Sequence, residues 1–146
     1  MTSRLPRGRL ALILLAAGLA APLAARAATA TLEPASGSKA KGQVTFLQDG
    51  SRVRAMGELT GLKPGRHGLQ VHEKGDCSAA DADRHGGASS TGDFGNITAS
   101  ASGAATVSTT LTGVSMASLM GKELVLRAKP DEKSDAGALV ACGVVK

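Results

Sequence analysis

Short segments in which apolar and polar residues alternate, separated by turn residues, constrain the fold of this chain more than any other feature. Successive side chains of a β-strand point to opposite faces, so alternation over a few residues predicts a half-buried strand. The predicted strands cover residues 29–33, 42–47, 53–62, 67–72, 96–99, 105–111, 123–128 and 140–145. Eight short strands with turn signals every 8–12 residues or so, and no long helical pattern, predict an all-β protein, an antiparallel sandwich or barrel.

The segments between the predicted strands include tight turns, one long connection and a charged loop over residues 129–137. Asp49-Gly50 is a typical hairpin pair, and Lys63-Pro64-Gly65 combines two residue types that favour turns. Residues 78–95 show no periodicity and are rich in Ala, Asp, Gly and Ser. We expect them to form a loop, and a loop of this length in a compact domain usually carries function or is disordered.

The core has to be built with few aromatic side chains, because the chain contains two Phe, no Trp and no Tyr. Val, Leu, Ile, Ala and Met are expected to fill it. Residues 114–120 are expected to form about one helical turn, with Met116 and Met120 on one face. These methionines are expected to pack in the core rather than to bind copper.

The chain begins with the three parts of a secretory signal peptide. Three arginines among the first nine residues precede an apolar run over 10–21, and Ala25-Arg26-Ala27 offers a cleavage site with small residues. A membrane anchor is the alternative, but the run is too short to span a bilayer and Pro22 interrupts it. We expect residues 1–27 to be removed on export and residues 28–146 to form one domain in the periplasm or outside the cell.

Removal of that segment changes the charge of the chain. It holds four of the 17 basic residues and none of the 12 acidic ones, so 13 basic and 12 acidic residues remain, a formal charge of +1. No long Lys/Arg run and no Trp or Tyr remains for nucleic acid to bind. We therefore expect no nucleic-acid partner and no membrane contact after cleavage, and the sequence indicates no particular protein partner.

The chain has two cysteines, and in an exported protein such a pair favours a disulfide. A bond between Cys77 and Cys142 would close a loop of about 65 residues and remove roughly 4 kcal/mol of unfolded-state freedom. The alternative is a pair of free thiols, which an oxidising compartment disfavours.

Residues 65–77 hold two of the three histidines and one of the two cysteines, in a pattern typical of a strand that runs into a turn. Alternation places Gln70 and His72 on one face and His67 on the other, with the apolar residues. Polar side chains two residues apart on one face can offer neighbouring ligands to a metal. The alternative is an edge strand whose polar face meets solvent.

Residues 65–73, Gly-Arg-His-Gly-Leu-Gln-Val-His-Glu, resemble the signature strand Gly-x-His-Gly-Phe-His-Val-His-Glu of the copper/zinc superoxide dismutases. Further similarity lies at residues 61–65, 92–97 (Gly-Asp-Phe-Gly-Asn-Ile), 119–126, 136–137 and 141–145. The resemblance implies an eight-stranded antiparallel Greek-key β-barrel, which agrees with the strand count. It also implies a disulfide between the two cysteines, and copper and zinc that serve to convert superoxide to hydrogen peroxide and oxygen.

The copper ligands that the resemblance implies are only partly present. The family holds copper with four imidazoles; His72 is retained, Gln70 replaces a second, and Arg127 stands where the late ligand is expected. A neutral amide is a poor copper ligand, and a guanidinium stays charged and has no lone pair to offer. Two unit charges about 4 Å apart repel by roughly 4 kcal/mol at an effective dielectric constant near 20, and a divalent ion by about twice that. We hypothesise that Arg127 occupies the vacated copper position and pairs with Asp131 or Gln70.

The implied zinc site is also incomplete. His85 resembles the family's His-Gly-Gly zinc ligand more than its bridging histidine, and Asp93 matches the zinc aspartate, but the next zinc histidine is Ser90 or Thr91. Two ligands fall short of the four of a structural zinc site. His85 as the bridging ligand, or as an exposed loop residue, is the alternative.

Three further residues match family positions outside the ligand set. His67 matches a histidine that packs and forms hydrogen bonds beside the copper, and Asp131 matches a carboxylate that orients metal-bound histidines. Leu139 stands where the family has the channel arginine, so local steering of the superoxide anion is lost.

These features predict an exported member of the family with a degraded copper site. We expect no competent copper dismutase and, at most, partial occupancy by copper or zinc at His72, His85 and Asp93. A weak metal binder or an interaction module then fits best. The alternative is a superoxide dismutase with a reduced or altered metal site.

Overall fold

The computed structural model describes residues 26–35, 37–73, 77, 90–130 and 137–146. The elements are β1 (Ala27–Pro34), β2 (Lys41–Asp49), β3 (Arg52–Thr60), β4 (Gly65–His72), β5 (Ser90–Ala99), β6 (Ala105–Thr112), α2 (Met116–Leu119), β7 (Glu123–Arg127) and β8 (Leu139–Val144). All strand pairs are antiparallel, so the predicted all-β class is confirmed. In the described ranges no helix has the length and apolar character that a membrane span requires.

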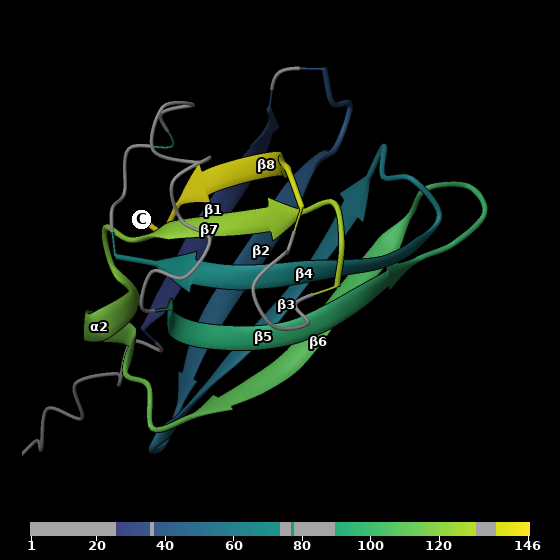
Figure 1. Ribbon diagram of the computed structural model, residues 1–146. Coiled ribbons are helices and arrows are strands. Elements are labelled where there is room, and N and C mark those ends of the chain that lie inside the picture. Colours follow the sequence, from purple (N-terminus) through teal and green to yellow (C-terminus); the bar gives the residue numbers. More distant parts are fainter. Residues whose placement is uncertain (1–25, 36, 74–76, 78–89, 131–136) are drawn as a thin grey trace, which may run out of the picture.

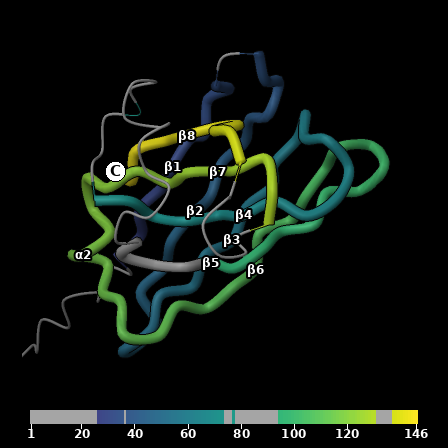
Figure 2. Tube along the Cα trace, viewed as in Figure 1, coloured from purple at the N-terminus to yellow at the C-terminus, as the bar shows by residue number. Residues whose placement is uncertain are grey.

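The eight strands form one sheet in the order β5-β4-β7-β8-β1-β2-β3-β6. β1, β2 and β3 are consecutive neighbours, after which the chain crosses to β4 and β5, returns to place β6 beside β3, and crosses again to β7 (Figure 1). Such returns to an earlier strand are the Greek-key connection. The end strands β5 and β6 also contact each other, so the sheet is a nearly closed barrel, and Figure 2 follows the chain around it. The predicted fold is confirmed.

The hairpin between β2 and β3 forms where the sequence predicts it. Asp49 pairs with Arg52 across a two-residue loop, and Gly50 has φ 59°, a left-handed conformation that glycine adopts readily. The Gln48 side chain donates hydrogen bonds to the carbonyl oxygens of Gly50 (2.9 Å) and Arg52 (3.0 Å), and its own oxygen accepts one from the Met116 amide (2.8 Å). One side chain therefore holds both the hairpin and the start of α2.

The predicted loop over residues 78–95 is wrong in its last part, because β5 begins at Ser90. The backbone of Ser90 pairs with that of His72, and the backbone of Asp93 pairs with that of Gln70, with register shifts between them. Backbone hydrogen bonds to β4 thus extend the strand where the side chains show no alternation. Residues 78–89 lie outside the described residues.

The barrel interior is filled mainly by Ala, Val, Leu and Ile, as expected, with both phenylalanines among them. Phe46 on β2 and Phe94 on β5 meet edge to face, with ring centroids 5.7 Å apart and planes at 65°. Met116 packs in this core, but Met120 is 48% exposed, so the expectation of core packing holds for Met116 and is wrong for Met120. The reason is local: α2 ends at Leu119, and Met120 has a non-helical backbone (φ −57°, ψ 132°).

Candidate metal centre

The histidine-bearing strand β4 lies beside β7, and the two strands together present polar side chains. His72 is directly opposite Glu123, and Gln70 is directly opposite Val125. Leu124 and Leu126 belong to the core, so alternation directs the other side chains of β7 to the face that carries Gln70 and His72. We call this surface the polar face; its polar members are Gln70, His72, Glu123 and Arg127.

The polar face is deeply buried for residues of this kind. His72 and Glu123 are each 2% exposed and Arg127 is 5% exposed, whereas Gln70 is half-buried. The guanidinium of Arg127 is therefore not directed into solvent. Burial of a charged group costs free energy unless opposite charge or hydrogen bonds compensate it.

His72 and Gln70 are hydrogen-bonded to each other. Nε2 of His72 lies 3.1 Å from Oε1 of Gln70. An amide oxygen only accepts, so Nε2 is the donor and carries the hydrogen. In this arrangement Nε2 has no lone pair to offer a metal.

The described residues of the polar face do not supply the four imidazoles of the copper site that the resemblance implies. Of the histidines in the described part of the chain, His72 alone lies on the polar face, since His67 has the parity of the core residues of β4. A buried cation, Arg127, shares the face. Among the described residues of this face, an ion that prefers several neutral nitrogen ligands would meet one imidazole, one amide, one carboxylate and one guanidinium.

His67 has a structural environment. It is 3% exposed, and its Nδ1 lies 2.9 Å from the carbonyl oxygen of Arg127 while its Nε2 lies 2.7 Å from that of Lys63. Both partners are backbone acceptors, and the imidazole ring lies between them. The imidazole thus connects the end of β7 to the turn before β4.

Replacement of His67 by Leu is expected to lower the free energy of unfolding by about 2 kcal/mol, because the buried imidazole loses a buried contact with the Arg127 carbonyl and a part-buried contact with the Lys63 carbonyl. His67→Gln, which keeps one donor group, should cost about half as much. Chemical denaturation of the two variants measures both losses. A cost for His67→Leu below about 0.5 kcal/mol, within the range of surface substitutions, would contradict the assignment.

Of the other residues expected near the metals, the structure describes two and leaves two outside the described ranges. Asp93 lies on β5 with its backbone paired to Gln70, which brings the two positions to neighbouring strands. Leu139 is half-buried on β8, opposite Arg127. His85 and Asp131 lie outside the described residues.

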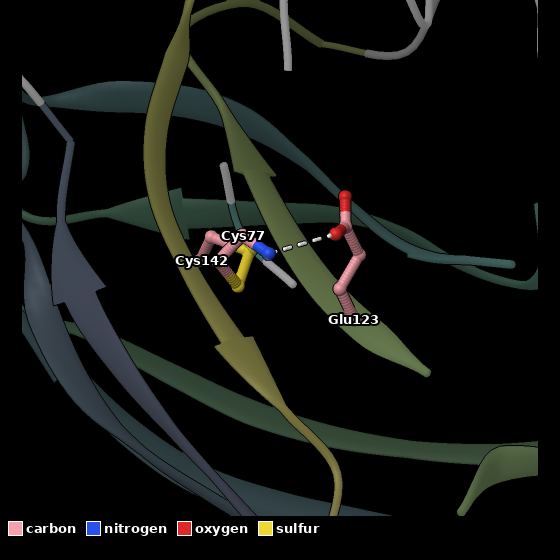
Figure 3. Close-up of side chains that lie close together, drawn as sticks. All are labelled: Cys77, Glu123 and Cys142. Atoms are coloured by element: carbon pink, nitrogen blue, oxygen red, sulfur yellow. Dashed lines mark hydrogen bonds between the residues drawn. A yellow bond between two sulfur atoms is a disulfide. The ribbon is translucent and has the colours of Figure 1, made fainter. Parts of the chain in front are cut away.

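The predicted disulfide is present and joins Cys77 to Cys142 on β8, with Cα atoms 5.7 Å apart (Figure 3). Cys77 has φ 52°, which is uncommon for a residue other than glycine. Its amide donates to Oε2 of Glu123 at 3.2 Å, so the disulfide and a buried carboxylate together hold this strained residue.

One group of three potential ligands gathers in the described part of the chain: Cys77, Glu123 and Cys142, with one ligand atom of each within 4.8 Å of the others. In the disulfide the sulfurs are not thiolates, the form that binds metals. Glu123 was not among the candidate site residues that the sequence indicated. Its signal is an acid at the start of an otherwise apolar strand, four residues before Arg127 and therefore on the same face.

The chain thus has the features of a class of small β proteins: a Greek-key barrel, a disulfide, and a strand with histidines beside a buried polar face. The family model described as copper/zinc superoxide dismutase (SODC) matches residues 40–145. The chain therefore belongs to the copper/zinc superoxide dismutase family.

Individual relatives agree with this assignment. A copper-zinc superoxide dismutase of Caulobacter vibrioides is 36% identical over 149 residues, which covers 82% of this chain and 85% of the relative. Superoxide dismutase 2 of the copper-zinc type from Mesembryanthemum crystallinum is 31% identical over 139 residues, 72% of this chain and 86% of the relative. The crystal structure of the clock protein EA4 matches with a TM-score of 0.69 at 26% identity and covers 83% of this chain and 94% of that one.

Proposed function

We propose that this chain is an exported member of the copper/zinc superoxide dismutase family that is not a competent copper dismutase. The observation that carries the proposal is that His72 donates its Nε2 hydrogen to Gln70 and that Arg127 is buried on the same face. The resemblance implies a histidine at the position of Arg127. Leu139, in place of the family's channel arginine, adds to it, because the anion then lacks a local cation to steer it.

Export is supported by the signal-peptide pattern of residues 1–27 and by the disulfide, since such bonds persist in oxidising compartments. The periplasm or the exterior of the cell is then the proposed location. In this setting the barrel serves as a weak copper or zinc binder through His72, His85 and Asp93, or as an interaction module. The positive charge of Arg127 takes the place of the missing ion.

A working superoxide dismutase is the second candidate, and the family membership and the names of both relatives favour it. Activity in protein loaded with copper and zinc separates the two candidates. We expect the disulfide-bonded wild-type chain to dismutate superoxide no faster than its metal-free form.

The double variant Gln70→His/Arg127→His is the matched control, because it restores two imidazoles and removes the buried cation. We expect its copper affinity to exceed that of the wild type by at least about 100-fold, since loss of even an outer partner of a ligand costs about 10–100-fold. Electron paramagnetic resonance of the bound copper should show nitrogen ligands, and His72→Ala in the same background should remove the gain. Wild-type turnover that depends on added copper and exceeds that of the metal-free form would overturn the proposal.

Metal content separates the weak binder from the interaction module. Protein purified from its own compartment is analysed for copper and zinc alongside His72→Ala. A stoichiometric metal that is lost in the variant identifies the binder. The same low content in both proteins identifies the module.

A further inference from the structure

The disulfide lies between a surface hollow and a buried carboxylate. On one side Cys77 and Cys142 line a hollow of about 460 Å³ whose other walls include Glu33 and Lys146. On the other side Glu123 is 2% exposed and accepts the Cys77 amide hydrogen (Figure 3). Both cysteines of the disulfide thus line the hollow, and a carboxylate oxygen lies close to them.

Strand pairing and a backbone hydrogen bond, in addition to the sulfur–sulfur bond, bring the three ligand residues together. Cys142 is held in β8 and Glu123 in β7, and the two strands are paired, with Cys142 opposite Val125. Cys77 is held by its amide hydrogen bond to Glu123. A Cα separation of 5.7 Å between the cysteines leaves room for the sulfurs to part and share one ion.

We propose that reduction of this disulfide creates a zinc site made of the two thiolates and the Glu123 carboxylate, with a fourth position open to the hollow. A dithiol supplies two electrons and two protons, the sulfur–sulfur bond breaks, and the dithiol becomes a disulfide. Zn²⁺ then displaces the two thiol protons and takes two sulfur ligands and one oxygen. Three protein ligands with one position left for water is a common zinc arrangement.

The site is specific for a soft or borderline ion and for the reduced chain. Thiolates select Zn²⁺ over the hard ions Ca²⁺ and Mg²⁺, which take oxygen ligands. It uses none of the histidines on which a dismutase-type site depends. The same three residues would then connect residue 77 to the barrel in both redox states, through a disulfide or through zinc.

The test is a titration of the full chain with Co²⁺, a zinc substitute whose thiolate charge-transfer bands report sulfur ligands directly. The protein is reduced with a phosphine, which does not compete for the metal as a dithiol does. Competition with Zn²⁺ then gives the zinc affinity. We expect one equivalent of cobalt with thiolate bands in reduced protein and no such bands in oxidised protein.

Glu123→Gln should weaken zinc binding by at least about 100-fold, because it removes a direct ligand and loss of an outer partner alone costs up to about that much. Glu33→Gln, on the rim of the same hollow, is the matched control and should leave the affinity unchanged. Equal affinity of Glu123→Gln and wild type, or the absence of thiolate bands in the reduced wild type, overturns the proposal.

Circular dichroism of the reduced chain accompanies the titration. If the reduced chain unfolds without metal, recovery of the strand signal on zinc addition supports the site, and failure to recover counts against it. Copper bound to imidazoles in the oxidised chain would contradict the proposed function but would not affect the zinc-site proposal. Failure of the proposed function can therefore be distinguished from failure of the zinc site.

Discussion

The double variant Cys77→Ser/Cys142→Ser is expected to have a free energy of unfolding about 4 kcal/mol lower than that of the oxidised wild type. The disulfide spans a sequence separation of 65, and the chain-entropy model assigns roughly this stabilisation to a loop of that length. For a domain of this size, such a loss is a large share of the total stability. Denaturation in urea, with both proteins in the presence of a chelator, measures the difference.

Reduced wild-type protein with chelator is the control for the serine side chains, and it should match the double variant. A loss below about 1 kcal/mol in both would mean that the barrel holds residue 77 without the bond, contrary to the chain-entropy account. A loss in the double variant alone would point to the buried serine hydroxyl at position 142, where the native side chain is 6% exposed.

Phe46→Ala is expected to lower the free energy of unfolding by about 4 kcal/mol, because Phe46 is 0% exposed and its removal leaves a cavity in a core with few large side chains. Apart from Phe94, the rest of that core is built from Ala, Val, Leu, Ile and one Met, and such a rigid barrel relaxes into a cavity only in part. Chemical denaturation of the variant measures the loss.

The edge-to-face contact with Phe94 can be measured separately by a double-mutant cycle with Phe94→Ala. We expect a coupling energy of about 1 kcal/mol, the usual worth of an aromatic pair beyond its area. A coupling near zero would show that the two rings contribute through burial alone.

The barrel was predictable because its determinants are local. Alternation in the segments that became β2, β3 and β6 follows from one face against the core and one against solvent, and the burial patterns of these strands repeat it. The Asp49-Gly50 turn was predictable because few residue types adopt a left-handed backbone. The start of β5 was not, since backbone pairing with β4 places Ser90 and Asp93 in a strand whatever their side chains are.

In the candidate site, too, the orientation of the side chains was predictable but their hydrogen-bond partners were not. The opposite orientations of His67 and His72 could be predicted from their odd spacing along one strand. The partner of each histidine could not, because His67 bonds to the carbonyls of Lys63 and Arg127, the latter 60 residues away. The exposure of Met120 depends likewise on where α2 ends.

The sequence by itself indicated most of the strands, the presence of Gln70 and Arg127 where the resemblance implies histidines, and two cysteines able to pair. Only the tertiary structure decided that Arg127 is buried and that Glu123 stands beside the disulfide. The physical reason is that periodicity reports which face of a strand a side chain occupies, whereas its neighbours across the sheet depend on the order and register of strands distant in sequence.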